Sequence, residues 1–268
     1  MNKTRKGSFE EDWYLKSFGD DFARIYHHKN KTAKEEVDAM LRYAQLPEKI
    51  EGVPAIAVLD LCCGWGRHAL EFAARGYDVT GIDTSDVLLQ VAQENAEKAG
   101  LKLRLMNADM RNFSLSHKVR LAVNLWTSFG YFSDDKENQA VLKNVWNVLE
   151  PGGIFILDLD NLPYFLRTTG AEVITVNSGG GRLVEALKRE EYEPERSRRV
   201  VSYRFLDPNK VAGTEGVYLE CRLYQYEDIR HALIRAGFRV NPEQKWGDFR
   251  GGPLTQNSPR MIVRADKP

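Results

Sequence analysis

The 268-residue sequence has few cysteines, no net charge and no long apolar run. Its three cysteines, two of them adjacent, make no disulfide framework and favour a reducing compartment. The 38 basic and 38 acidic residues cancel, so no overall field attracts nucleic acid or an anionic membrane. Apolar runs stop short of the about 18 residues of a membrane-spanning helix, and the N-terminus lacks an apolar signal core. We therefore expect a cytoplasmic protein with neither nucleic acid nor a membrane as partner.

The strongest pattern in the sequence is a strand, a tight loop and a helix over residues 57–68. The apolar run 57–61 predicts a buried parallel strand, and residues 69–73 have the apolar spacing of a helix. Gly64 and Gly66 mark the loop between them. Glycine permits positive φ and close approach of a ligand, and the next helix offers unpaired N–H groups. The loop is therefore suited to a nucleotide-like ligand.

Two acidic residues restrict the kind of ligand that this loop can bind. Asp60 precedes the loop, where a fixed negative charge would repel a pyrophosphate. Asp83 ends the second predicted strand, the position from which a carboxylate accepts hydrogen bonds from ribose hydroxyls. A ligand with a ribose, a positive centre and no phosphate fits both acids, and S-adenosylmethionine is the common one.

These residues resemble the class I S-adenosylmethionine-dependent methyltransferases, and the resemblance spans roughly residues 18–161. The segment 60–66 is similar to the first motif of the family, with Cys62 where many members have a glycine. Asp83 matches the acid of the second strand, residues 107–110 resemble the segment whose acid meets adenine, and residues 149–153 resemble the turn before the fifth strand.

The resemblance implies an α/β fold: a Rossmann-like, doubly wound seven-stranded sheet, with an inserted antiparallel β subdomain after the fifth strand. We expect four segments: an N-terminal helical cover over 1–48, the cofactor-binding core over 49–170, the insert over 171–224, and the C-terminal completion of the sheet over 225–268. Alternating apolar residues with glycine-rich and Asp-Pro-Asn turns favour the insert.

The resemblance also implies the site. We expect S-adenosylmethionine to contact Tyr14, Asp60, Cys62, Gly64, Gly66, Arg67, Asp83, Thr84, Asp109, Met110 and Leu125. Tyr26, His28 and Tyr131 are the candidate catalytic residues. His27 and His28 are adjacent and point in different directions from a helix, so we expect no metal site there.

The acceptor side is less sharply defined. Residues 126–132 place four aromatics at the end of the fourth predicted strand, where open α/β sheets hold ligands. Residues 188–199 mix both charge signs and are interpreted as a solvated hairpin. Asp158 and Asp160 are expected on opposite faces of a strand, and Asp248 is either a turn acid or an acceptor ligand.

Methyl transfer needs alignment of two reactants more than an acid, so no catalytic triad is required. The sequence therefore predicts transfer of a methyl group to a small-molecule acceptor, with nitrogen favoured over oxygen or carbon; it leaves the oligomeric state unknown. Three alternatives remain: an RNA or protein methyltransferase, a dinucleotide-dependent oxidoreductase, and a non-catalytic S-adenosylmethionine-binding module.

Overall fold

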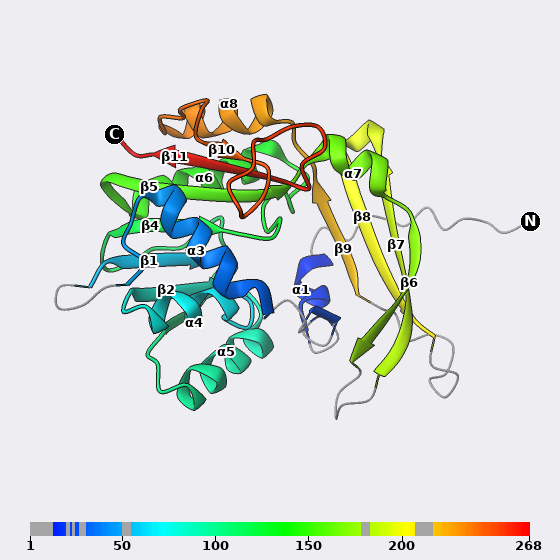
Figure 1. The fold of residues 1–268 in the computed structure, drawn as a ribbon, viewed down its shortest axis with the longest axis horizontal. Coiled ribbons are helices and arrows are strands. Elements are labelled where there is room, and N and C mark those ends of the chain that lie inside the picture. Colours follow the sequence, from blue (N-terminus) through cyan, green and yellow to red (C-terminus); the bar gives the residue numbers. More distant parts are fainter. Residues whose placement is uncertain are drawn as a thin grey trace, which may run out of the picture.

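Two β-sheets face each other across the N-terminal segment in the computed structural model (Figure 1). The structure describes residues 13–19, 22, 25–26, 31–49, 55–177, 183–206 and 217–268. The larger sheet has seven strands: β1 (Ala57–Leu61), β2 (Asp78–Asp83), β3 (Arg104–Asn107), β4 (Val119–Asn124), β5 (Leu149–Asp160), β10 (Lys245–Trp246) and β11 (Arg260–Asp266).

The strand order of this sheet is β10-β11-β5-β4-β1-β2-β3. The first five strands of the chain run parallel, with Val58 of β1 between Val79 of β2 and Leu121 of β4. β11 is antiparallel to β5, and β10 is antiparallel to β11. The predicted Rossmann-like sheet is therefore confirmed. Residues 238–240 contribute only an isolated bridge at Arg239, and the strand beside β11 at the edge of the sheet is β10.

Helices cover both faces of the large sheet (Figure 1). α6 (Asp135–Val148) and α8 (Tyr226–Ala236) pack on one face, and α3 (Ala33–Ala44) and α4 (Arg67–Ala74) pack on the other. α5 (Asp86–Lys98) lies beside α4 and contacts β2 and β3. Successive residues of a strand point to opposite faces, so Val58 packs against the α3 side and Leu59 against the α6 side.

The second sheet is inserted after β5, as predicted. A short helix, α7 (Leu162–Thr168), leads into four antiparallel strands in sequence order: β6 (Ala171–Asn177), β7 (Leu183–Glu193), β8 (Arg198–Phe205) and β9 (Tyr218–Arg222). A 3₁₀ turn, η2 (Pro194–Arg196), joins β7 to β8. Sequence reasoning missed β7, because its charged residues obscured the strand pattern.

The N-terminal part has two distinct positions. α1 (Trp13–Ser17) lies between the two sheets and contacts β9, whereas α3 packs on α4 and β5 of the core (Figure 1). α1 therefore lies in the space between the sheets, and α3 is part of the core. The division of the chain at residues 48, 170 and 224 remains a prediction.

Candidate active site

A cavity of about 500 Å³ lies between the carboxyl ends of the parallel strands and the inserted sheet. Residues of the glycine loop, of the ends of β2 and β4, and of strands β6 to β9 line it, together with Tyr14 and Tyr26 from the N-terminal segment. Its size lies within the roughly 300 to 1,000 Å³ range of small-molecule sites, and the open end of a parallel sheet is where such folds bind ligands.

Asp83 fixes the conformation of the glycine loop. The backbone N–H of Gly64 donates to Asp83 Oδ2 at 2.8 Å, and that of Ser85 donates to Oδ1 at 3.0 Å. Burial raises the pKa of Asp83, and these N–H groups oppose the rise. Asp83 and Thr84 both line the cavity. The carboxylate is thus held at the end of β2, with lone pairs left for a ligand.

The loop has unusual backbone geometry, beginning at Cys62 and Gly64. Gly64 has φ of 55° and Cys62 has φ of 63°, both in the left-handed region that a side chain normally disfavours. Cys62 is the position at which the resemblance expects a glycine. Its thiol packs against Met110, with Sγ 3.6 Å from Sδ, and both residues line the cavity.

Asp60 is the most unusual titratable group of the site. Its side chain is 1% exposed and lines the cavity, and its Oδ2 is buried without a hydrogen-bond partner among the described residues. Burial raises the pKa of Asp60 to about 7, against the lowering effect of the Arg67 charge. A buried carboxylate with an unsatisfied oxygen favours a cationic ligand group.

Gly66 does not line the cavity, in contrast to its expected role. It has φ of 77°, and a Cβ added there would lie 2.9 Å from Cβ of Ala92 on α5. Glycine is therefore needed at this position for the close packing of the loop on α5. The contact of Gly66 with the cofactor stays a prediction.

Asp109 lines the cavity at the end of β3 and is held by Arg111. Arg111 Nε donates to both carboxylate oxygens of Asp109, and Arg111 Nη2 also donates to the Tyr14 hydroxyl at 3.0 Å. Burial alone would raise the pKa of Asp109, but the hydrogen bonds and charge of Arg111 lower it. The ionised acid expected to meet adenine is thus connected to the N-terminal segment.

Glu36 of α3 organises the wall behind the glycine loop, and sequence reasoning missed it. Its Oε2 accepts from Arg67 Nη1 and His68 Nε2, both at 2.6 Å, and from Trp126 Nε1 at 2.9 Å. Burial opposes ionisation, yet the His68 hydrogen bond and the Arg67 charge lower the pKa of Glu36 to about 2. An acid among the apolar residues of a predicted helix face was the available signal.

Arg67 and His68 line the cavity from the first turn of α4. Burial, together with the charge of Arg67, lowers the pKa of His68 to about 4, so its imidazole is neutral near pH 7. The Arg67 guanidinium lies over the Trp126 ring, 5.0 Å from its centroid. Arg67 is therefore present at the cavity as expected, in a paired and stacked arrangement.

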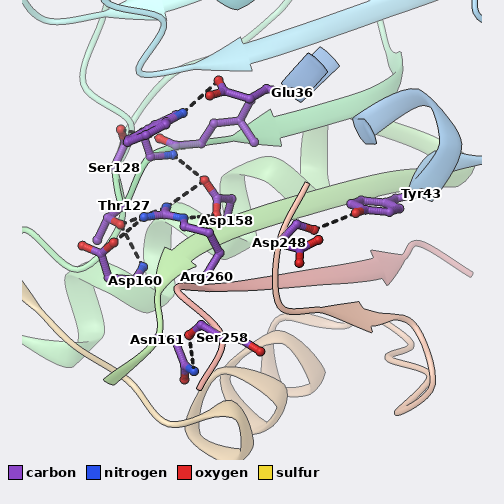
Figure 2. A network of polar contacts seen from close by, with 12 residues as sticks. Glu36, Tyr43, Thr127, Ser128, Asp158, Asp160, Asn161, Asp248, Ser258 and Arg260 are labelled. Atoms are coloured by element: carbon purple, nitrogen blue, oxygen red, sulfur yellow. Dashed lines mark hydrogen bonds and ion pairs between the residues drawn. The ribbon is translucent and has the colours of Figure 1, made fainter. Parts of the chain in front are cut away.

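Arg260 joins the ends of β4, β5 and β11 (Figure 2). Its Nε and Nη2 donate to Asp158 at 2.8 Å each, and its Nη1 pairs with Asp160. Asp158 Oδ2 accepts in turn from the backbone N–H of Trp126. The expectation of opposite faces for Asp158 and Asp160 is wrong, because residues two apart on a strand point to the same face.

Two of the three candidate catalytic residues, Tyr26 and Tyr131, line the cavity. The hydroxyls of Tyr26 and Tyr203 are 2.7 Å apart, and Tyr131 lines the same cavity from the turn after β4. Burial raises the pKa of Tyr26 and of Tyr131, so both phenols are neutral near pH 7 and suited to hydrogen bonding. His28 lies outside the described residues.

Two further residues can be compared with the expectations. Leu125 lines the cavity, as the resemblance implies. Asp248 accepts hydrogen bonds from the backbone N–H groups of Arg250 and Gly252, at 2.7 and 3.0 Å, and is not among the described residues that line the cavity. It is a turn acid.

The inserted strands bring charged side chains into the cavity that the sequence placed in solvent. Lys188 of β7 and Arg199 of β8 line it, and their side chains are 21% and 18% exposed. The interpretation of residues 188–199 as a solvated hairpin is therefore wrong for these two residues. One partner of each, Glu172 for Lys188 and Asp160 for Arg199, lies outside this segment, so their inward position could not be read from local charge.

Comparison with known proteins agrees with the geometry. A family model described as a methyltransferase domain matches residues 58–153. The chain is 28% identical to an N,N-dimethyltransferase of dTDP-3-amino-3,4,6-trideoxy-alpha-D-glucopyranose from Streptomyces venezuelae, over 69% of this chain and 76% of that protein. It is 27% identical to a glycine/sarcosine N-methyltransferase of Halorhodospira halochloris, over 60% of this chain and 63% of that protein.

Solved structures share the fold. The structure of DesVI from Streptomyces venezuelae aligns with a TM-score of 0.65 at 22% identity, over 94% of this chain and all of that one. An S-adenosylmethionine-dependent methyltransferase of Clostridium acetobutylicum aligns with a TM-score of 0.69 at 20% identity, over 92% and 96%.

The fold and the cavity define a Rossmann-like methyltransferase. The chain belongs to the class I S-adenosylmethionine-dependent methyltransferases, and S-adenosylmethionine is its cofactor. This excludes the dinucleotide-dependent oxidoreductase. No helix in the described part of the chain is long and apolar enough to cross a membrane, and the same part holds no cluster of metal-ligating side chains.

The residues present fit this cofactor. The unsatisfied Oδ2 of Asp60 is suited to a positive group, and the carboxylate of Asp83 is held at the strand end where ribose hydroxyls bind. When bound, S-adenosylmethionine supplies a methyl group on a sulfonium centre. The remaining chemistry belongs to the chain, which must exclude water and align a nucleophile.

Proposed function

We propose that the enzyme transfers the methyl group of S-adenosylmethionine to a nitrogen of a small-molecule amine. The observation that supports this most directly is the cavity itself. It is continuous from the glycine loop to the inserted sheet, and carboxylates line both parts, including Asp60 and Asp83 on one side and Asp160 and Glu172 on the other.

Acidic walls suit an acceptor that arrives as an ammonium ion. Such an amine must lose a proton before it attacks, because only the neutral nitrogen has a free electron pair. The phenols of Tyr26 and Tyr131, which are neutral near pH 7, would position the amine by hydrogen bonds. Relatives named as amino-sugar and glycine N-methyltransferases favour nitrogen as the acceptor atom.

The size of the cavity also favours a small acceptor over a macromolecular one. The inserted sheet and the N-terminal segment lie over the ends of the parallel strands, so an acceptor must fit within about 500 Å³ together with the cofactor. A nucleotide inside a folded RNA or a side chain inside a folded protein would not reach this space without opening it.

The test combines binding and turnover. Calorimetry with S-adenosylmethionine establishes the donor site, and a screen over amines, phenols and indoles then detects methylated product by mass spectrometry. Methylated amines together with S-adenosylhomocysteine are the expected result. Turnover restricted to phenols or indoles would overturn the nitrogen assignment, and tight donor binding without transfer to any small molecule would overturn the proposal.

A further inference from the structure

Two cations line the acceptor side of the cavity from the inserted sheet, and each already contacts two carboxylates. Lys188 Nζ lies 3.0 Å from Glu172 Oε1 and 3.2 Å from Glu190 Oε2. Arg199 pairs through Nη1 with Asp160 and through Nη2 with Glu190. Glu190 is therefore the carboxylate that both cations share.

The strand geometry places Glu190 behind the two cations. Lys188 and Glu190 are two residues apart on β7, so their side chains point to the same face of the inserted sheet. Lys188 and Arg199 line the cavity, whereas Glu190 is not among the described lining residues and its side chain is 14% exposed. Its charge nevertheless reaches both cations.

These ion pairs determine which charged groups of an acceptor can bind beside Lys188 and Arg199. A carboxylate on the acceptor would need a cation with uncompensated charge, and both Lys188 and Arg199 are offset by Glu190 and by one further acid each. Arg260, the other cation near Asp160, is likewise held by Asp158. A second carboxylate beside these acids would be repelled.

A hydroxyl group on the acceptor does not need an uncompensated cation as its partner. The neutral phenols of Tyr26 and Tyr203 stand on the same side of the cavity and can donate to and accept from a hydroxyl. Amines bearing hydroxyls thus find partners on this wall, whereas none of the described cations Lys188, Arg199 and Arg260 offers an uncompensated charge to a carboxylate.

We infer that Glu190 is a specificity-determining residue that excludes carboxylate-bearing amines, so that the acceptor is a hydroxylated amine without an acidic group. This inference rests on the proposed N-methylation. Glu190 acts by neutralising Lys188 and Arg199. Removal of its charge leaves the positive charges of these two side chains less compensated at the cavity wall.

The experiment compares matched acceptors that differ only by a hydroxymethyl or a carboxylate group. The pairs are ethanolamine and glycine, N-methylethanolamine and sarcosine, and glucosamine and its C6-oxidised uronate. Values of kcat/KM are measured at saturating S-adenosylmethionine for the wild type, for Glu190→Gln, and for Glu191→Gln as the control. Glu191 lies on the same strand with its side chain 63% exposed, 3.9 Å from Arg189, and undergoes the same change of charge.

We expect the wild type to prefer the hydroxymethyl member of each productive pair by about tenfold or more, and Glu190→Gln to shift this ratio about tenfold toward the carboxylate member. Glu191→Gln should leave the ratio within about twofold. A wild type that prefers carboxylates, or a folded Glu190→Gln variant with an unchanged ratio, overturns the inference while N-methylation stands.

If the wild type methylates neither these amines nor any other amine of the wider screen, the proposed function fails instead, which separates the two outcomes. Thermal unfolding and donor affinity show whether Glu190→Gln keeps the fold. Should it not fold, the preference of the wild type within each pair still decides whether carboxylates are excluded.

Discussion

Replacement of Asp60 by asparagine should stabilise the cofactor-free protein above pH 7 and weaken binding of the donor. Burial raises the pKa of Asp60 from 3.8 to about 7. Between these values the native state keeps a proton that the unfolded chain has released, so the stability of the native state falls as pH rises. A shift of this size corresponds to about 4 kcal/mol above pH 7, as an upper limit.

Asparagine has no charge to bury, so Asp60→Asn should lack this loss. We expect its free energy of unfolding at pH 8 to exceed that of the wild type by about 1 to 4 kcal/mol, and the difference to shrink as pH falls toward 4. Urea denaturation at a series of pH values measures it. A difference that does not change with pH would refute the assignment of the raised pKa to Asp60.

With S-adenosylmethionine bound, the wild type should become more stable than Asp60→Asn. A cationic group beside Asp60 favours the ionised carboxylate, so the wild type should bind S-adenosylmethionine more tightly as pH rises through about 7. Asp60→Asn should bind it more weakly and without this pH dependence. Saturating donor then stabilises the wild type more than the variant. Asp78→Asn, at an exposed acid of β2, is the control and should leave donor affinity unchanged.

Three other substitutions test separate parts of the site. Asp83→Asn should weaken donor binding by about 1 to 3 kcal/mol in calorimetry, and an unchanged dissociation constant in a folded variant would remove Asp83 from the site. Gly66→Val should destabilise the fold by about 1 to 3 kcal/mol in urea denaturation, because its Cβ meets Ala92, and Ala92→Gly should recover part of the loss. Tyr131→Phe should raise the acceptor KM or lower kcat, while the donor dissociation constant changes by less than about 0.5 kcal/mol; a collapse of donor affinity alone would place Tyr131 in the donor site.

The residues that line the donor half of the cavity could be predicted from the sequence, because local strand, turn and helix patterns determine their positions. The strand ending at Leu61, the loop at Gly64 and the acid at Asp83 follow one another within a short stretch, and each obeys a rule of strand, turn or helix formation. A parallel sheet then brings the ends of β1, β2 and β3 to one edge. Sequence order alone therefore predicts which side chains meet there.

The acceptor half could not be read in this way. Arg199 pairs with Asp160, which lies 39 positions earlier, and Glu36 holds Trp126, 90 positions later. These contacts depend on the packing of α3 on the core and of the inserted sheet across the cavity, neither of which has a local pattern. The charges of β7 were assigned to solvent because alternating charge usually marks an exposed surface.

The polar contacts at the strand ends give the two halves of the site a physical connection. Glu36 reaches the turn after β4 through Trp126, whose backbone N–H bonds to Asp158, and Arg260 joins Asp158 to Asp160 (Figure 2). Asp160 then pairs with Arg199 on the inserted sheet. Methyl transfer depends on the alignment of donor and acceptor, and a misplacement of 1 Å can cost about a hundredfold in rate. A continuous set of buried, charge-assisted contacts from one reactant's wall to the other is therefore suited to hold that alignment, whatever acceptor the enzyme methylates.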